Sequence, residues 1–269
     1  MMRRPLIAGN WKMHLTPSEG AALATTLRQR IGMRSDVEIL LCPSFVALQA
    51  VGEAIRGSEM KLGAQNAFWR DAGAFTGQVS PAMLCAVGCE YVILGHSETR
   101  GRFGVNDPDL DPSLLPYFSE TEATLNRKLR AVLPHGLKPI LCVGETLAER
   151  AAGQTESVIR KQLEGALAGI AADELYELVI AYEPVWAIGT GQVCEADEAN
   201  RVCGFIRQTL RELYDEELAE FVRILYGGSV KASNAHALLH QPEIDGALVG
   251  GASLNAEEFE QISYCAPTR

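Results

Sequence analysis

Eight short apolar runs recur along this chain, separated by longer segments that mix apolar and polar residues. The runs cover residues 5–9, 37–42, 61–64, 91–95, 139–144, 178–182, 223–227 and 246–250. Most are apolar at consecutive rather than alternate positions, as strands buried on both faces of a parallel sheet require. The run at 61–64 shows this pattern least clearly. The sequence therefore predicts an α/β fold with parallel strands.

The longer segments between the runs repeat with a helical period. Within residues 195–214, Val202, Ile206 and Leu210 mark one apolar face of a helix. Residues 157–170 show the same spacing of apolar side chains. These segments predict helices that cover the sheet.

Two positions indicate where the first helices begin. Thr16 stands before Pro17, so a capping side chain precedes a proline in the first turn. Ser44, which follows Pro43, is a candidate cap for the second helix.

Strands that alternate with helices fit two architectures, a closed barrel and an open doubly wound sheet. The pattern alone favours the barrel only slightly. The 269 residues, 47% of them hydrophobic, suffice for one barrel of ordinary size and its core. There is no linker, low-complexity tract or sustained charge run that would mark a second domain. Residues 1–269 are therefore expected to form a single domain.

Charge, cysteine content and hydropathy narrow the location and partners of the protein. The net charge of −10 argues against nucleic acid, which attracts basic patches. The seven cysteines include no CxxC pair, which predicts reduced thiols in the cytosol rather than disulfides or zinc ligands. The first apolar run is too short for a signal peptide, and no stretch approaches the ~18 apolar residues of a membrane helix. The sequence predicts a soluble, cytoplasmic protein.

Chemically useful residues follow several of the runs. In a parallel sheet all strand carboxyl ends lie at one end of the fold, where active sites are found. The residues concerned are Asn10 and Lys12 after the first run, His96 after the fourth, Glu183 after the sixth, residues 227–229 after the seventh, and Gly250 and Gly251 after the eighth.

These residues form a consistent chemical set. Glu183 can act as a general base, His96 can donate a hydrogen bond to a carbonyl, and Lys12 can stabilise negative charge. The glycines allow backbone N–H groups to approach an anion. Taken singly, each residue also fits an exposed rim position or a tight turn. Their common location favours proton abstraction next to the carbonyl of a phosphorylated substrate.

The motifs around these residues resemble the triosephosphate isomerase family from about Pro5 to the last helix. They are Ala8-Gly-Asn10-Trp-Lys12-Met, Gly95-His96-Ser97-Glu98, Pro139-Ile-Leu-Cys142-Val-Gly-Glu145, Ala181-Tyr-Glu183-Pro-Val-Trp-Ala-Ile-Gly189-Thr-Gly191, Tyr226-Gly-Gly-Ser229-Val and Asp245-Gly-Ala-Leu248-Val-Gly250-Gly251-Ala-Ser. The eleven-residue stretch that ends at Gly191 is specific by itself.

The resemblance implies a (β/α)8 TIM barrel that interconverts dihydroxyacetone phosphate and D-glyceraldehyde 3-phosphate through an enediolate, a reaction of glycolysis and gluconeogenesis. It implies that Glu183 moves the proton and that a neutral His96 acts on the carbonyl oxygens. Lys12 would supply positive charge, oriented by Glu98 and with Asn10 nearby. Backbone N–H groups of Gly189, Ser229, Gly250 and Gly251 would bind the phosphate, beneath a mobile loop at residues 189–191. No cofactor and no metal are implied.

His96 is further expected to remain neutral well below the ordinary range of histidine. It precedes a predicted helix start at Ser97-Glu98, where N–H dipoles disfavour an imidazolium.

The resemblance also implies self-association, as a homodimer or a tetramer built on dimers. Residues 66–80, from Asn66 to Ser80, resemble a loop that enters the neighbouring subunit. Aromatic residues in such a long loop need burial, either there or against their own barrel.

The sequence departs from the family pattern at three places. Gln192-Val193-Cys194 stands where a lysine-led hinge is common, and Thr99 stands where an arginine is common. Residues 101–116 have no counterpart and carry three prolines and three aspartates, so neither helix nor strand is expected. We expect a surface loop with Asp107, Asp109 and Asp111 in water. Its apolar residues would pack on the outer helices or on a neighbouring subunit; they are Phe103, Val105, Leu110, Leu114 and Leu115.

Three other functions fit parts of this pattern. An isomerase of another short ketose phosphate, such as a four-carbon one, would use the same base and phosphate loops. A non-catalytic barrel used as a scaffold predicts the loss of a catalytic group, whereas Lys12, His96 and Glu183 are all present. A metal-dependent aldolase requires ligand spacing that no His, Asp and Glu cluster in this sequence shows.

Overall fold

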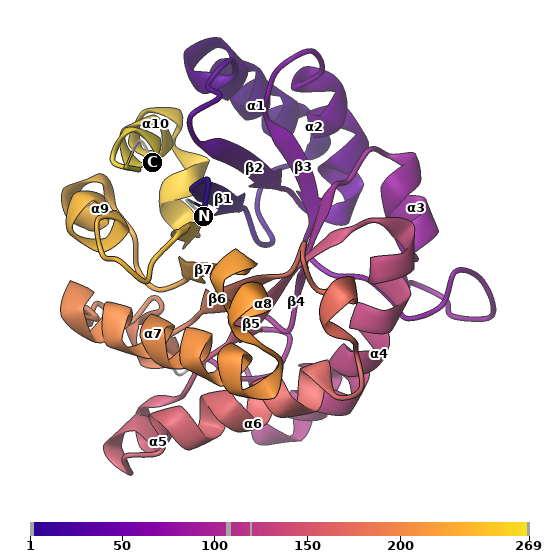
Figure 1. Ribbon diagram of the computed structural model, residues 1–269. Helices are drawn as coiled ribbons and strands as arrows, with labels where there is room; N and C mark the ends of the chain where they lie inside the picture. The colour runs from indigo at the N-terminus through magenta and orange to yellow at the C-terminus, as the bar shows by residue number, and fades with distance from the viewer. Residues whose placement is uncertain (1–2, 106–108, 119, 268–269) are drawn as a thin grey trace.

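The computed structural model describes residues 3–105, 109–118 and 120–267. Eight parallel strands close into a barrel in which each strand pairs with the next and β8 pairs with β1 (Figure 1). The strands are β1 (Leu6–Asn10), β2 (Glu38–Cys42), β3 (Lys61–Ala64), β4 (Tyr91–Leu94), β5 (Lys138–Val143), β6 (Val179–Tyr182), β7 (Arg223–Tyr226) and β8 (Gly246–Val249). All eight apolar runs are strands, including the weak one at 61–64. The closed barrel is confirmed, and the open sheet is wrong because β1 pairs on both edges.

Helices surround the barrel on its outside (Figure 1). They are α1 (Pro17–Ile31), α2 (Leu48–Ala54), α3 (Pro81–Ala86), α4 (Glu122–Val132), α5 (Leu147–Ala151), α6 (Thr155–Leu167), α7 (Ala196–Leu213), α8 (Glu216–Phe221), α9 (Ala232–Leu239) and α10 (Ala256–Tyr264). The helices predicted at 157–170 and 195–214 are α6 and α7. In the part of the chain that the structure describes, no helix is long and apolar enough to cross a bilayer.

Consecutive strand residues pack in two directions, which explains why the runs are continuously apolar. One cluster fills the barrel and includes Leu40, Cys42, Ile93 and Cys142. A second, larger cluster joins the outer faces of the strands to the helices. Most strand residues are therefore next to an apolar surface on one side of the sheet or the other, and few positions can be polar without a partner.

The two predicted helix caps have different outcomes. Thr16 caps α1 through a capping box, in which its side chain and that of Glu19 each bond to the other's backbone N–H. The prediction for Ser44 is wrong. Ser44 precedes a 3₁₀ turn, η1 (Phe45–Ala47), and its side chain makes no capping bond. The second helix begins only after this turn, at Leu48.

The segment at 101–116 is more regular than its composition predicts. A 3₁₀ helix, η2 (Pro112–Phe118), occupies its second half, and Asp111 begins this turn by accepting the N–H of Ser113 at 2.6 Å. Short 3₁₀ pieces of this kind suit a sequence that cannot continue as an α-helix. Asp109 and Asp111 are exposed as predicted, whereas Asp107 and Pro108 lie outside the described residues.

Candidate active site

The predicted strand-end residues gather around one cavity at the carboxyl ends of the strands. Its volume is about 290 Å³. The lining comprises Asn10, Lys12, His96, Ile188, Gly189, Gly227, Gly228, Ser229, Val230, Lys231, Leu248, Gly250, Gly251, Ala252 and Glu258. Two predicted site residues, Glu98 and Glu183, lie beside the cavity and contact residues that line it. The barrel thus brings together residues from both ends of the sequence.

Lys12 is held in a left-handed backbone conformation with φ of 51°, which is rare for a residue with a side chain. Its N–H donates to Asn10 Oδ1 at 3.1 Å, and its carbonyl accepts from Gln65 Nε2 at 2.8 Å. The ammonium group reaches Glu98 Oε1 at 2.7 Å. Backbone strain of this kind persists where surrounding bonds impose it, often at functional sites. The amide of Gln65 and the carboxylate of Glu98 therefore fix both ends of Lys12.

Glu183 is 2% exposed and lies against the turn that follows β4. Its Oε2 accepts the N–H of Ser97 at 2.8 Å, and its Oε1 lies 2.7 Å from His96 Nε2. The backbone carbonyl of Glu183 passes over Gly144, where an added Cβ would lie 1.7 Å from that oxygen. Only glycine at the end of β5 leaves room for the chain that carries Glu183.

The imidazole of His96 is oriented by both of its nitrogens. Its Nδ1 accepts the N–H of Glu98 at 3.2 Å, so in the neutral ring the proton resides on Nε2, the nitrogen that lies 2.7 Å from Glu183 Oε1. Burial lowers the pKa of His96, but the carboxylates of Glu183 and Glu98 raise it more, and the net pKa is raised. The expectation of a pKa well below the ordinary range is therefore wrong for this arrangement. The sequence did not reveal that Glu183 would rest on the imidazole.

Glu98 is charged despite partial burial. Burial raises the pKa of its carboxyl group, but His96 and Lys12 lower it more, so the net pKa is below its usual range. Lys12 Nζ donates directly to Oε1 of Glu98. A permanent anion at this point holds the Lys12 ammonium at the cavity wall.

The glycines at the cavity serve two different purposes. An added Cβ at Gly227 would lie 3.0 Å from Glu183 Cγ, and one at Gly228 would lie 2.2 Å from Tyr226 Oη. These two glycines allow β7 to pack closely beneath the site. By contrast, a Cβ at Gly189 or Gly251 would meet no atom within 4 Å, and at Gly250 it would meet only Lys12 Cε at 3.6 Å. The open space beside these three glycines is available to a ligand.

A buried carboxylate behind the site was not singled out from the sequence. Glu145 is fully buried, and its Oε1 accepts from Trp186 Nε1 at 2.8 Å and from Tyr182 Oη at 3.2 Å. Burial raises the pKa of Glu145 despite these hydrogen bonds. Glu145 thereby fixes Trp186, in the first turn of the loop after β6. Its position at the end of the fifth apolar run was the signal that could have identified it.

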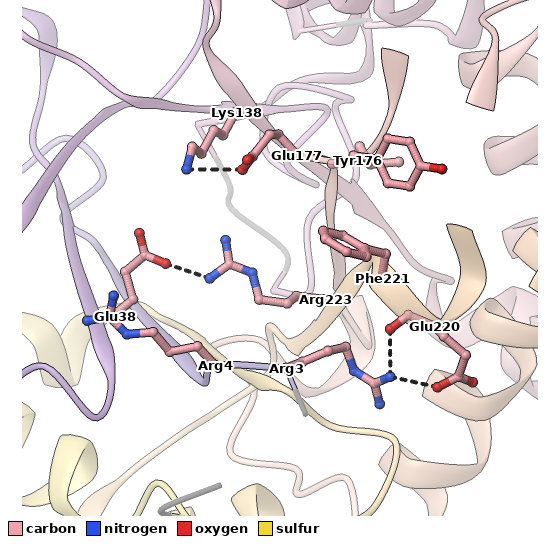
Figure 2. A pocket seen from close by; sticks show the side chains of 10 residues that line it. Arg3, Arg4, Glu38, Lys138, Tyr176, Glu177, Glu220, Phe221 and Arg223 are labelled. Atoms are coloured by element: carbon pink, nitrogen blue, oxygen red, sulfur yellow. Dashed lines mark hydrogen bonds and ion pairs between the residues drawn. The ribbon is translucent and has the colours of Figure 1, made fainter. Parts of the chain in front are cut away.

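A second cavity, of about 250 Å³, lies at the opposite end of the barrel, where β2, β5 and β7 begin. Figure 2 shows its charged lining residues, except Arg4, paired with one another. Arg223 bonds to Glu38, Lys138 to Glu177, and Arg3 to Glu220. Arg4 donates to the carbonyl of Val37. The cations that line this cavity are thus paired with carboxylates or a backbone carbonyl of the protein. The cavity at the other end has open space beside its glycine loops.

Within residues 3–105, 109–118 and 120–267, no three His, Cys, Asp or Glu side chains gather as metal ligands would. Cys42 and Cys142 lie in the barrel core, where burial raises the pKa of each thiol.

Comparison with known proteins identifies close relatives. Residues 5–266 match the family model described as triosephosphate isomerase. The curated triosephosphate isomerase of Moorella thermoacetica is 51% identical over 97% of this chain and 98% of its own length. That of Carboxydothermus hydrogenoformans is 50% identical over 97% and 98%, and that of Chloroflexus aurantiacus is 50% identical over 98% and 99%. The similarity therefore extends through every strand of the barrel.

Proposed function

This chain belongs to the triosephosphate isomerase family and interconverts dihydroxyacetone phosphate and D-glyceraldehyde 3-phosphate; we propose that Glu183 carries the proton between the two carbons. The observation that supports this most strongly is the Glu183–His96 contact of 2.7 Å beside a cavity lined by Lys12. It places a base and a hydrogen-bond donor next to each other, with a cation on the same cavity wall. Such a set removes a proton from carbon while the adjacent carbonyl oxygen becomes negative.

The bound substrate replaces Glu183 as the partner of His96 Nε2. His96 Nε2, which lies beside Glu183 Oε1, donates its proton in a hydrogen bond to the carbonyl oxygen of the bound triose phosphate. Glu183 is then free to approach the carbon that bears the proton. Lys12, held by Glu98, stabilises the enediolate oxygen as negative charge develops. His96 transfers the hydroxyl proton from one enediolate oxygen to the other, and return of the carbon-bound proton from Glu183 to the neighbouring carbon completes the isomerisation without a cofactor.

The phosphate group binds on the opposite side of the cavity. We assign it to backbone N–H groups of Gly189, Ser229, Gly250 and Gly251, which all line the cavity. The open space beside Gly189 and Gly251, and beside Gly250 except for the Lys12 side chain, gives the phosphate oxygens room to approach the backbone. Asn10 also lines the cavity, and its Oδ1 fixes Lys12 by accepting the N–H of that residue.

A coupled assay with three-carbon and four-carbon ketose phosphates tests the substrate assignment. The cavity of about 290 Å³ is small, and we expect turnover of the triose phosphates to exceed that of the four-carbon compounds by orders of magnitude. Equal turnover of the four-carbon compounds would favour the broader isomerase. The same assay with EDTA should give an unchanged rate, and a metal-dependent rate would point to aldolase chemistry.

We also propose that this chain is a single cytoplasmic domain that forms homodimers through residues 66–80. The loop projects from the barrel between β3 and α3 (Figure 1). Phe68 stacks on Trp69 with ring centroids 4.0 Å apart, and Phe75 remains 39% exposed near the tip. A prominent loop with an exposed aromatic residue is suited to burial in a second subunit. Sedimentation analysis of the wild type and of Phe75→Ser tests this assignment.

A further inference from the structure

The residues that follow the His96 turn are firmly anchored to two neighbouring strand ends. The N–H of Arg102 donates to the carbonyl of Ser97 at 2.9 Å. Its guanidinium donates to the carbonyl of Gly144, at the end of β5, at 3.1 Å, and contacts the carboxylate of Glu149. Glu149 is itself fixed, because it belongs to the capping box of α5 with Thr146. Arg102 therefore has little freedom to shift.

Gly104 lies directly on the loop that follows β6. A Cβ added at Gly104 would lie 2.2 Å from the carbonyl oxygen of Val185, 2.5 Å from that of Ile188 and 3.3 Å from Thr190 Cγ2. Gly104 is not among the residues with positive φ, so the backbone conformation itself would accept a side chain. Space alone requires glycine here, because the two backbones are in contact.

Phe103 supports this contact from the other side. Its ring meets the edge of Phe118 with centroids 5.7 Å apart and ring planes at 88°. Phe118 ends η2, the 3₁₀ helix in the segment that departs from the family pattern. The first apolar residue of that segment thus packs on Phe118, two positions beyond residue 116, where we expected the outer helices or a neighbouring subunit. The segment from Arg102 to Gly104 is thereby held between η2 and the loop after β6.

The loop after β6 has a fixed beginning and an open middle. Val185 N–H donates to the carbonyl of Glu145 at 3.1 Å, and the carbonyl of Ala187 accepts from Ser229 Oγ at 2.7 Å. Further along, Gly189 and Gly191 have φ of 71° and 79°, and an added Cβ at either would touch nothing. Gly104 contacts the fixed part at Val185 and reaches the start of the open part at Ile188 and Thr190.

We infer that Arg102 and Gly104 are positioning residues for the isomerase reaction: they form a rigid support that sets the position of the first turn of the loop after β6. This inference rests on the proposed role of Glu183, which lies two residues before Val185. A displaced first turn would move Glu183 relative to His96 and would change how the open part of the loop reaches the phosphate. Neither Arg102 nor Gly104 touches the substrate cavity.

A displaced loop after β6 should produce a side reaction that a general loss of stability does not produce. An enediolate that is poorly covered expels its phosphate with the electron pair of the C–O bond. The remaining enol tautomerises to methylglyoxal, and no further reactant is needed. Exclusion of water and a fixed phosphate suppress this loss. The ratio of inorganic phosphate released to isomerisation therefore reports how well the loop is positioned.

Gly104→Ala is the direct test. We expect kcat to fall about 10²-fold, because a displacement of roughly 1 Å at a reacting group costs that much. We expect KM to change less than kcat, and the released-phosphate ratio to rise on the order of tenfold. Gly52→Ala is the control, since its Cβ would crowd Leu62 Cδ2 at 3.1 Å, beside a cavity that the active-site residues do not line. This control should change thermal stability only.

Arg102→Met provides a second route if Gly104→Ala does not fold. It removes the donors to Gly144 and Glu149 without adding atoms near the loop, and the phosphate ratio should rise in the same direction. Arg102→Lys retains the charge beside Glu149 and should largely restore the ratio. A wild-type phosphate ratio in folded Gly104→Ala, or in Arg102→Met where only that variant folds, overturns the inference. Failure of the proposed function itself is separate, because it would appear as activity retained in Glu183→Gln.

Discussion

The two ends of the barrel use the same kinds of residues for different purposes. At the amino-terminal end, Glu38 of β2 accepts from Arg223 of β7 at 2.6 Å and from Tyr91 of β4 at 2.9 Å (Figure 2 shows the ion pair). At the carboxyl end, Glu183 has one imidazole and one backbone N–H as partners. A guanidinium partner is permanently charged and remains in place. An imidazole can instead exchange the carboxylate for a substrate oxygen as its hydrogen-bond partner.

The same contrast appears around Asp245, at the start of β8. Arg207 donates to Asp245 Oδ2 at 2.7 Å, Arg3 donates to Oδ1 at 2.8 Å, and the N–H of Ile224 adds a third bond. These bonds connect β7, β8, α7 and the N-terminal segment. The amino-terminal end therefore uses its charges to join elements, whereas the carboxyl end leaves open space beside the backbone of its glycine loops. The following variants test this division.

Glu183→Gln should produce the largest effect on catalysis. The amide cannot accept the proton, so we expect a loss of about 3–5 kcal/mol of transition-state stabilisation with folding intact. Steady-state kinetics and thermal unfolding measure the two quantities. Glu38→Gln makes the same change at the other end and should reduce stability while the rate per folded molecule stays normal. Near-normal turnover in folded Glu183→Gln would refute the proposed base.

Arg223→Met should have the largest effect on stability. It leaves the carboxylate of Glu38 buried without its cation, which we expect to cost about 3 kcal/mol in the free energy of unfolding. Urea denaturation measures this cost, and kcat should remain near that of the wild type. Arg201→Met breaks the exposed pairs with Glu156 and Glu198 and should cost about 1 kcal/mol or less.

The stability difference between wild type and Arg223→Met should also depend on pH. Burial raises the pKa of Glu38, but Arg223 and Tyr91 lower it more, so the folded-state pKa lies below the usual value of 4.5. A lowered pKa contributes stability above 4.5, and this contribution is lost as pH falls through the folded-state pKa. The difference should therefore narrow in acid. A difference that stays constant to pH 2 would show that packing, not charge, accounts for the effect.

Lys12→Ala should weaken substrate binding and turnover together. Both the phosphate and the enediolate are anionic, and we expect kcat/KM to fall about 10²-fold. The difference in kcat/KM between the wild type and Lys12→Ala should be smaller at high salt than at low salt, because salt screens the charge interaction. Lys138→Ala removes a lysine from the other end and should leave kcat/KM unchanged. An equal loss in both variants would mean that overall charge, and not position, is responsible.

The smallest expected change is in the titration of His96. In Glu183→Gln the carboxylate that raises the pKa of His96 is gone, while burial, which lowers it, remains. The pKa of His96 should therefore be lower in the variant than in the wild type. NMR titration of the imidazole measures both. An unchanged pKa would show that Glu98, rather than Glu183, controls the charge of His96.

Local sequence was sufficient wherever a pattern depends on near neighbours. The consecutive apolar residues of each run predicted the strands, because a strand buried on both faces needs apolar side chains at every position. Thr16 predicted the start of α1, because its cap bonds to residues within one turn. The location of Asn10, Lys12, His96 and Glu183 at one end of the fold followed from parallel strands alone.

Tertiary structure decided the contacts between residues far apart in sequence. The amide of Gln65 that holds Lys12 comes from 53 positions away, and the N–H that receives Glu183 comes from 86 positions away. Ser44 had the right residue type for a cap, yet the chain forms a 3₁₀ turn there. The raised pKa of His96 and the need for glycine at position 104 depend on where the loop after β6 lies. No local pattern encodes such distances, because they arise only when the barrel closes and brings the strand ends together.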